Sequence, residues 1–366
     1  MRLLTEGQLI RDTYEVERFL GEGAFAEVYR VKHRFLGRQA MKVFKRVGMG
    51  EEEILEMLGE AILLTHIGHP NIVRVFEANI LESAQGTCGY FTMEHIAGGS
   101  LDKFWRSHGG KFVPVTATID LMRQICRGLS IAHNEKPPII HRDIKPQNIL
   151  VGYEADGLRA RVSDFGLAKK VNPLTLLATA AGTFAFKPPE TFSARRSDSC
   201  AADVWAIGMT LYLLLTDKLP FNIPAPVTNG VGRAFEVPLV KPSTINPDAD
   251  DHLDEIVAKA LALKSEDRFA TAGELLDSLE KWTPATVDGR RKRKTFTSEP
   301  SKTILGTATG ADSKLADKLT MRALQARENG RLAEAADLME EAFNKLPDLR
   351  AKYAHQVRLW RCGVSM

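Results

Sequence analysis

The chain has 366 residues, which is enough for two domains of ordinary size. With 44% hydrophobic and 26% charged residues it has the balance of a soluble protein with a sizeable core, and a net charge of +3 gives no reason to expect nucleic acid or an anionic membrane as the main partner. No apolar stretch is long enough to span a bilayer, and four widely spaced cysteines indicate reduced thiols, so a cytoplasmic location is expected.

Short strand patterns dominate the first hundred residues, after an N-terminal extension over residues 1–13. The strand-like runs cover residues 15–20, 26–33, 39–44, 73–78 and 89–95. The helical patterns cover residues 51–66, 115–134, 202–215 and 251–263. A sheet-rich half followed by a helix-rich half predicts an α+β fold with two lobes.

The composition changes after Trp282. Residues 284–313 are rich in Thr, Ser, Gly, Pro and basic residues and include a basic run at 290–294, which predicts a linker. A nuclear or membrane address is the alternative for the basic run, but no transmembrane or amphipathic helix follows it.

A helical segment is expected over residues 314–366. Small residues at Ala326, Ala335 and Ala342 and a closing Pro347 resemble one tetratricopeptide repeat. A generic helical hairpin is the alternative. Because one repeat cannot bury its own apolar face, we expect it to pack on the rest of the chain, on a second copy or on a protein partner.

A glycine-rich turn joins the first two strand patterns. It begins at Gly21 and Gly23, where the lack of a Cβ lets backbone amides approach phosphate oxygens. A dinucleotide-binding fold would place a helix next, whereas a strand follows here. A plain hairpin turn remains the alternative for this motif on its own.

Lys42 lies inside the otherwise apolar run 40–44. A buried lysine is costly unless it is paired, and Glu60 on the predicted helix is a candidate partner. The alternative is a lysine that reaches solvent from a strand edge.

The segment 141–148 reads His-Arg-Asp-Ile-Lys-Pro-Gln-Asn, and Asp164-Phe165-Gly166 follows after a strand and a turn. Phosphoryl transfer needs a loop over the phosphates, a cation to hold them, ligands for Mg²⁺ and a carboxylate to orient the attacking hydroxyl. With these motifs in this order, the chain resembles the eukaryotic-type (Hanks-type) serine/threonine protein kinase family.

The resemblance covers residues 14–283 and implies the bilobal protein kinase fold. It places an N-terminal lobe at residues 14–93, a hinge at 94–98 and a C-terminal lobe at 99–283. It implies an enzyme that transfers the γ-phosphoryl group of ATP to serine or threonine hydroxyls of protein substrates.

The resemblance also implies the roles of single residues. Asp143 orients the attacking hydroxyl, and Lys145 neutralises the γ-phosphate and is typical of the serine/threonine type. Lys42, paired to Glu60, contacts the α- and β-phosphates. Asn148, like these residues, belongs to the catalytic set.

Mg²⁺, with Mn²⁺ as a substitute, is expected on Asn148 and Asp164. Met93 aligns with the residue before the hinge, whose backbone is expected to bind adenine. The nucleotide-binding residues implied by the resemblance are Gly21, Glu22, Gly23, Ala24, Val28, Ala40, Lys42, Glu94, Ile96 and Asp164.

The resemblance also implies one ion pair and one backbone cap that support this architecture. Glu190 should pair with Arg268, and Asp203 should cap the backbone of the segment 141–148. The usual Ala-Pro-Glu at the end of the activation segment is Pro188-Pro189-Glu190 here, and the doubled proline stiffens the segment.

Arg142 next to Asp143 indicates control by phosphorylation of the following segment. Thr175 and Thr179 are the candidate autophosphorylation sites, with ordinary loop threonines as the alternative. Thr183 resembles a threonine that contacts the catalytic residues and is assigned to the substrate loop.

A pseudokinase scaffold and a small-molecule kinase are the alternatives to an active protein kinase. A pseudokinase scaffold would bind partners through the kinase fold and the helical tail, but such scaffolds lack part of the catalytic set, which is complete here. A small-molecule kinase of related fold would lack the full string at 141–148 and the segment that ends at Glu190.

Overall fold

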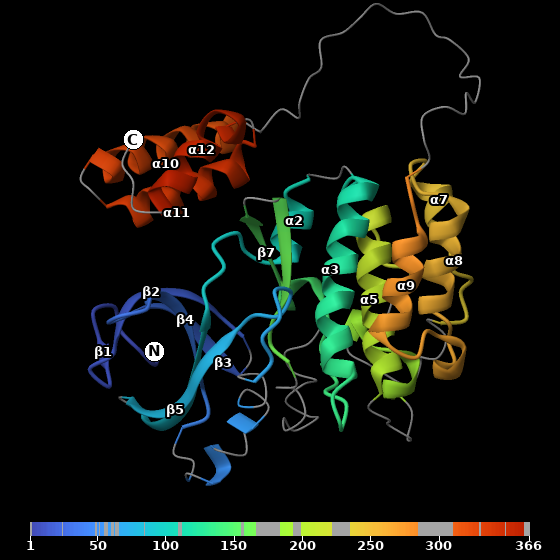
Figure 1. Ribbon diagram of the computed structural model, residues 1–366, viewed down its shortest axis with the longest axis horizontal. Helices are drawn as coiled ribbons and strands as arrows, with labels where there is room; N and C mark the ends of the chain where they lie inside the picture. Colours follow the sequence, from blue (N-terminus) through green and yellow to red (C-terminus); the bar gives the residue numbers. More distant parts are fainter. Residues whose placement is uncertain are drawn as a thin grey trace, which may run out of the picture. The chain divides into compact units, whose positions relative to one another are not determined.

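The computed structural model describes residues 2–23, 25–47, 50, 52–54, 58–59, 62, 66–83, 85–108, 112–154, 157–165, 184–192, 199–221, 235–284, 310–328, 331–347 and 349–361. The chain divides into two compact units. The larger unit runs to Trp282 and holds a sheet and a group of helices, and the smaller unit contains three C-terminal helices (Figure 1).

A six-stranded antiparallel sheet forms the N-terminal lobe, in the order β1-β2-β3-β4-β6-β5. Its strands are β1 (Leu9–Ile10), β2 (Tyr14–Glu22), β3 (Ala26–His33), β4 (Gly37–Phe44), β5 (Val75–Ser83) and β6 (Gly86–Glu94). The strands β5 and β6 join through a tight turn near Gly86, whose φ of 121° favours glycine. The short runs of β-branched and aromatic residues therefore became strands, with shifted ends.

The sheet buries apolar side chains on both faces. Along β4, Met41 and Val43 belong to one core cluster, whereas Ala40 and Phe44 belong to the other, because successive side chains of a strand alternate between faces. Lys42 shares the second face. This face continues into the core of the helical lobe, so Lys42 points to the side of the sheet where the two lobes meet.

The N-terminal extension is folded into this lobe. Leu3 and Leu4 are 6% and 2% exposed, and both join the core cluster on the face of the sheet that points away from the helical lobe. The N–H of Leu3 donates to Glu27 at 2.9 Å, and that of Leu4 donates to the Tyr29 hydroxyl at 3.1 Å. The extension therefore covers an apolar surface of the sheet.

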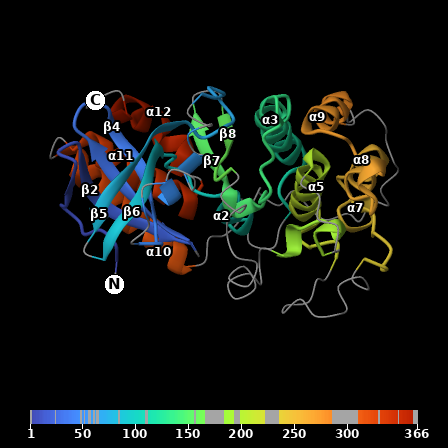
Figure 2. The same ribbon diagram turned by 90° about the horizontal axis from the view of Figure 1, so that it is seen from below.

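The C-terminal lobe is mainly helical. Its helices are α2 (Leu101–Arg106), α3 (Val115–His133), α5 (Cys200–Thr216), α7 (Pro242–Ile245), α8 (Asp251–Ala260) and α9 (Ala272–Lys281), with 3-10 turns η1 (Pro146–Asn148), η2 (Phe184–Phe186), η3 (Pro189–Phe192) and η4 (Ser265–Asp267). A two-stranded sheet joins β7 (Ile149–Glu154) to β8 (Gly157–Val162). Figures 1 and 2 show α3, α5 and α9 packed side by side.

The helix α5 forms the centre of this lobe and is buried along nearly its whole length. A Cβ at Gly208 would lie 2.9 Å from the Cβ of Ala260 and 3.0 Å from Leu261, so only glycine permits α5 to approach α8 this closely. The predicted helix over residues 202–215, which is too short to span a membrane, thus forms the core of the lobe. In the part of the chain that the structure describes, no helix is both long and apolar enough to cross a bilayer.

The smaller unit holds α10 (Gly310–Glu328), α11 (Leu332–Lys345) and α12 (Leu349–Arg361). The first of these helices begins inside the segment 284–313 that was expected to be a linker, so the linker prediction extended too far. Trp360 of α12 is 1% exposed and shares a core cluster with Met339 and Phe343 of α11. The third helix therefore covers apolar surface of the other two, so the unit buries a core of its own.

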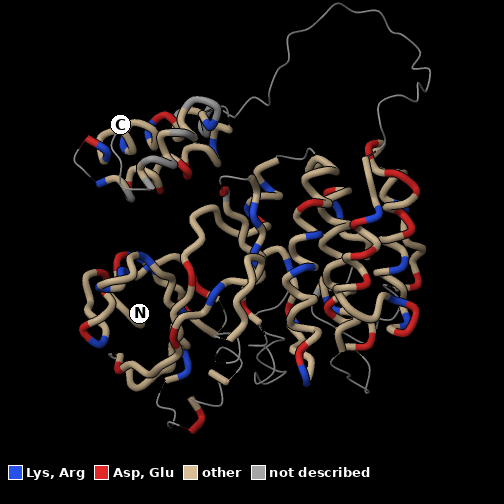
Figure 3. Tube along the Cα trace, in the orientation of Figure 1, with Lys and Arg blue, Asp and Glu red and all other residues tan. Residues whose placement is uncertain are grey.

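Charged residues are mixed over both units. Figure 3 shows Lys and Arg interspersed with Asp and Glu along the described chain. This mixing agrees with the small net charge of +3.

Candidate active site

The segment 141–148 rests on a buried carboxylate from α5. Asp203, 1% exposed, accepts the backbone N–H of His141 at 2.7 Å and that of Arg142 at 2.8 Å. Arg142 has a φ of 66°, a left-handed conformation that costs free energy in a residue with a side chain. The predicted capping by Asp203 is confirmed, and it stabilises the strained backbone directly before Asp143.

His141 joins this segment to the one that carries Asp164. Its Nε2 donates to the carbonyl oxygen of Ser163 at 2.8 Å, and its Nδ1 accepts the N–H of Asp143 at 3.2 Å. Its ring lies 4.7 Å from that of Phe165, centroid to centroid. Burial lowers the pKa of His141, and both ring nitrogens are used in the neutral form, so the imidazole stays uncharged.

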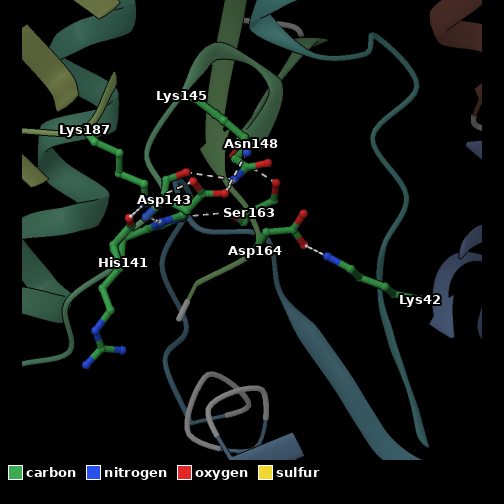
Figure 4. A network of polar contacts seen from close by, with 9 residues as sticks. Lys42, His141, Asp143, Lys145, Asn148, Ser163, Asp164 and Lys187 are labelled. Carbon is green, nitrogen blue, oxygen red and sulfur yellow. Dashed lines mark hydrogen bonds and ion pairs between the residues drawn. The ribbon is translucent and has the colours of Figure 1, made fainter. Parts of the chain in front are cut away.

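The carboxylate of Asp143 is held by several cationic and polar groups (Figure 4). Its Oδ2 accepts from Lys145 Nζ at 2.7 Å and from Asn148 Nδ2 at 3.0 Å, and the same amide nitrogen donates to the Asp143 carbonyl at 2.8 Å. Burial by itself would raise the pKa of Asp143, but Lys145 and Lys187 outweigh it and hold that pKa below its usual range. Asp143 is therefore an ionised acceptor at neutral pH.

Lys187 is a contact that the sequence did not predict. Its Nζ lies 3.5 Å from Oδ1 of Asp143 and donates to the carbonyl oxygen of Arg142 at 2.6 Å (Figure 4). The sequence offered no signal for it, because Lys187 lies in another segment and only the tertiary fold brings it to Asp143.

Lys42 reaches the second half of the site. Its Nζ lies 2.6 Å from Oδ1 of Asp164, and the two side chains are 13% and 27% exposed. Asp164 has a φ of 62°, so its backbone is also left-handed. The predicted pairing of Lys42 with Glu60 stays a prediction, because Glu60 is outside the described residues.

Three of the residues expected to contact ATP share one face of the sheet. Val28 is the cross-strand partner of Lys42, and Ala40 lies two residues before it on β4, so all three side chains share one face. A Cβ built on Gly21 or Gly23 meets no atom of the described residues within 4 Å. The space beside the glycine-rich turn is thus open, which fits the approach of a ligand.

The hinge residues lie where β6 ends. Glu94 is the last residue of β6 and pairs through its carboxylate with Arg161 at 3.3 Å, while Ile96 is half-buried. Glu22, beside the glycine-rich turn, pairs with Lys45 at 3.1 Å.

Several predicted site residues lie outside the residues that the structure describes. They are Ala24, Glu60, Gly166, Thr175, Thr179 and Thr183. Their expected roles stay predictions.

A protein kinase domain model matches residues 14–280 of this chain. The chain belongs to this family. A probable serine/threonine-protein kinase of Clostridium acetobutylicum is 31% identical over 277 residues, which cover 75% of this chain and 40% of that protein. The tyrosine-protein kinase MasK of Myxococcus xanthus is also 31% identical, over 75% of this chain and 44% of MasK. The chain thus spans about two fifths of the length of the curated relatives it matches.

Solved structures of protein kinase domains share the fold. The kinase domain of PknI from Mycobacterium tuberculosis superposes with a TM-score of 0.58 over 76% of this chain and 98% of the PknI chain, at 24% sequence identity. The predicted bilobal architecture is therefore confirmed.

The kinase site contains oxygen donors suited to a magnesium ion. The amide nitrogen of Asn148 is directed at Asp143, which leaves the amide oxygen for another partner. Asp164 contributes a carboxylate. Since Mg²⁺ prefers carboxylate and carbonyl oxygens and keeps part of its hydration, one carboxylate and one amide fit this ion.

Proposed function

We propose that this chain is a serine/threonine protein kinase, which transfers the γ-phosphoryl group of ATP to serine or threonine hydroxyls of proteins. The observation that carries the proposal is the carboxylate of Asp143, held by Lys145 and Asn148 beside the Lys42–Asp164 pair. A base, a cation for the transferred group and the metal ligands are thereby gathered at one place.

In the proposed reaction the acceptor hydroxyl donates a hydrogen bond to Asp143. As the hydroxyl oxygen forms a bond to the γ-phosphorus, the bond from that phosphorus to the β,γ-bridging oxygen breaks and ADP leaves. The proton of the hydroxyl passes to the Asp143 carboxylate. Lys145, whose Nζ is 2.7 Å from Oδ2, neutralises charge on the phosphoryl group during transfer.

ATP would bind along the sheet face that carries Val28, Ala40 and Lys42, with adenine at the backbone of Glu94 and Ile96. Gly21, Glu22, Gly23 and Ala24 would cover the phosphates. Lys42 orients the α- and β-phosphates.

Asn148 and Asp164 would hold Mg²⁺, with Mn²⁺ as a substitute. The bound ion supplies neutralisation of phosphate charge. The amide nitrogen of Asn148 donates to Asp143, so the side chain that would bind the metal also helps to orient the proposed base.

The choice of serine and threonine rests on Lys145 and on relatives named as serine/threonine-protein kinases. One relative of similar identity is named a tyrosine-protein kinase. The acceptor residue is therefore a separate outcome of the test below.

Regulation is proposed through Arg142 and the threonines of the activation segment. Phosphate on Thr175 or Thr179 would supply the anion that the positive charge of Arg142 favours. Thr183 is proposed to contact Asp143 and Lys145 as part of the substrate loop.

The helical unit is proposed as a tetratricopeptide-like interaction module, through which the chain binds a protein partner or a second copy of itself. Its support is the pattern of small residues, of which Ala326, Ala335 and Ala342 are buried between helices. A cytoplasmic location is proposed as well, and the described cysteines Cys88, Cys126 and Cys200 form no disulfide.

The decisive experiment measures transfer of labelled γ-phosphate from ATP with Mg²⁺ to the chain itself and to a general acceptor protein. The wild type is compared with an Asp143→Asn variant, for which a loss of about 10²-fold or more is expected. Hydrolysis of the product identifies the acceptor: label on serine or threonine supports the proposal, and label on tyrosine alone overturns the substrate class. Equal incorporation by both proteins would contradict the role of Asp143.

A further inference from the structure

Lys187 brings a second cation to the catalytic carboxylate, from a segment separate from the one that carries Lys145. It lies between η2 and η3, and its side chain is 18% exposed. Among the described residues, its Nζ contacts the Arg142 carbonyl oxygen at 2.6 Å and Asp143 Oδ1 at 3.5 Å (Figure 4). The lysine thus touches both the strained residue and the base that follows it.

The backbone on both sides of Lys187 is fixed. Phe186 before it is 7% exposed and belongs to the core of the lobe, and Pro188 after it restricts the lysine to extended conformations. Two residues further, Glu190 is held by Arg268 through hydrogen bonds of 2.7 and 2.8 Å. A lysine on a fixed backbone loses less conformational entropy when its side chain becomes ordered, so the ammonium group is held in one position.

The two oxygens of Asp143 are engaged unequally. Oδ2 accepts from Lys145 at 2.7 Å and from Asn148 at 3.0 Å. Oδ1 has a longer contact, to Lys187 Nζ at 3.5 Å. Oδ1 is therefore the oxygen with capacity left for the hydrogen of a substrate hydroxyl.

We propose that Lys187 is a positioning residue of the active site, which holds Oδ1 of Asp143 in the orientation that accepts the substrate hydroxyl. Lys145 and Asn148 fix one edge of the carboxylate, and Lys187 fixes the other. The inference rests on the proposed kinase function for its kinetic consequence. The placement of the carboxylate itself does not depend on turnover.

The kinetic test compares Lys187→Met, which keeps the length of the side chain and removes its charge, with Lys187→Arg, which keeps the cation. We expect Lys187→Met to lower kcat about 10-fold with KM for ATP within about twofold, because a misplaced base affects the chemical step. Lys187→Arg should retain at least about half of kcat. Lys264→Met, at an exposed position of the same lobe, is the matched control.

Thermal unfolding of each variant separates positioning from folding. An unchanged kcat in Lys187→Met overturns the proposal, and so does an equal loss in Lys187→Met and Lys187→Arg. A kcat loss that is matched by a lower melting temperature in Lys187→Met alone also counts against it, since the lysine would then act on stability.

A crystal structure of Lys187→Met supplies a readout without turnover. We expect the Asp143 side chain to rotate away from its position in the wild type, with Oδ1 displaced. An unmoved carboxylate overturns the positioning role. If the wild type transfers no phosphate at all, the proposed function fails, while this comparison still decides whether Lys187 places Asp143.

Discussion

Arg268 binds Glu190 through two parallel hydrogen bonds, of 2.7 Å from Nη1 and 2.8 Å from Nη2. The guanidinium is 0% exposed and also donates to carbonyl oxygens of Ala201, Ala262 and Leu263. This pair ties η3 to the loop at η4 and confirms the ion pair expected from the sequence. Its position just after Lys187 gives it a consequence for the active site.

Removal of Glu190 should destabilise the protein and lower kcat. Glu190→Ala leaves a fully buried guanidinium without its anion, for which we expect a loss of about 3 to 5 kcal/mol in the free energy of unfolding. Chemical denaturation measures this loss. Glu266→Ala removes an exposed carboxylate in η4 and should leave the denaturation midpoint close to that of the wild type. Equal effects of the two substitutions would contradict the structural role of the pair.

Asp203→Asn should weaken the segment that carries Asp143. The carboxylate accepts backbone N–H groups with both oxygens, so an amide turns one acceptor into a donor that faces a donor. We expect a loss of about 2 kcal/mol or more in the free energy of unfolding and a fall of kcat. Asp251→Asn, at an exposed site in α8, is the control. A wild-type kcat in Asp203→Asn would show that the backbone bonds are not needed.

His141 predicts a pH dependence of stability. Burial lowers the pKa of His141 below 6.5, so below pH 6.5 the unfolded chain binds a proton that the folded chain refuses. The contribution of His141 is therefore complete above pH 6.5 and falls as the pH drops below it, by up to about 1.4 kcal/mol per pH unit. Urea unfolding between pH 5 and about 7.5 should show this slope, reduced in His141→Gln.

The control for this titration is His252→Gln, since His252 is exposed on α8. Its slope should equal that of the wild type. A His141→Gln variant with the full slope would assign the pH dependence to other groups.

Leu4→Ala tests the role of the N-terminal extension. Leu4 is 2% exposed against the outer face of the sheet, so the substitution should cost about 2 to 4 kcal/mol of unfolding free energy. Leu36→Ala makes the same chemical change at a residue that is 67% exposed and should cost less than about 0.5 kcal/mol. If both variants unfold at the wild-type midpoint, the extension adds nothing to the lobe.

The order of strand and helix patterns predicted the two-lobed α+β fold, and the motifs, through the family resemblance, predicted the set of reacting groups. The segment from His141 to Asn148 holds a base, a cation and a metal ligand within a few residues, so local backbone geometry keeps them together in any fold that contains the segment. Strands and helices were found from the period of the apolar residues, although their ends shifted by a few residues. The apolar period does not define element ends closely, and α10 begins at Gly310 instead of at residue 314.

Other relationships were decided by tertiary structure. Lys187 meets Arg142 across 45 residues, a distance in sequence at which spacing carries no information on contact. The contact of Asp203 with His141 across 62 residues was expected from the family resemblance and not from spacing. The N-terminal extension likewise packs on the sheet, because its leucines complete an apolar core there. No strand or helix pattern in residues 1–13 predicted this. The groups of the segment 141–148 were predicted because they are neighbours in sequence, whereas the place of Lys187 and of the N-terminal extension was not, because long-range packing decides both.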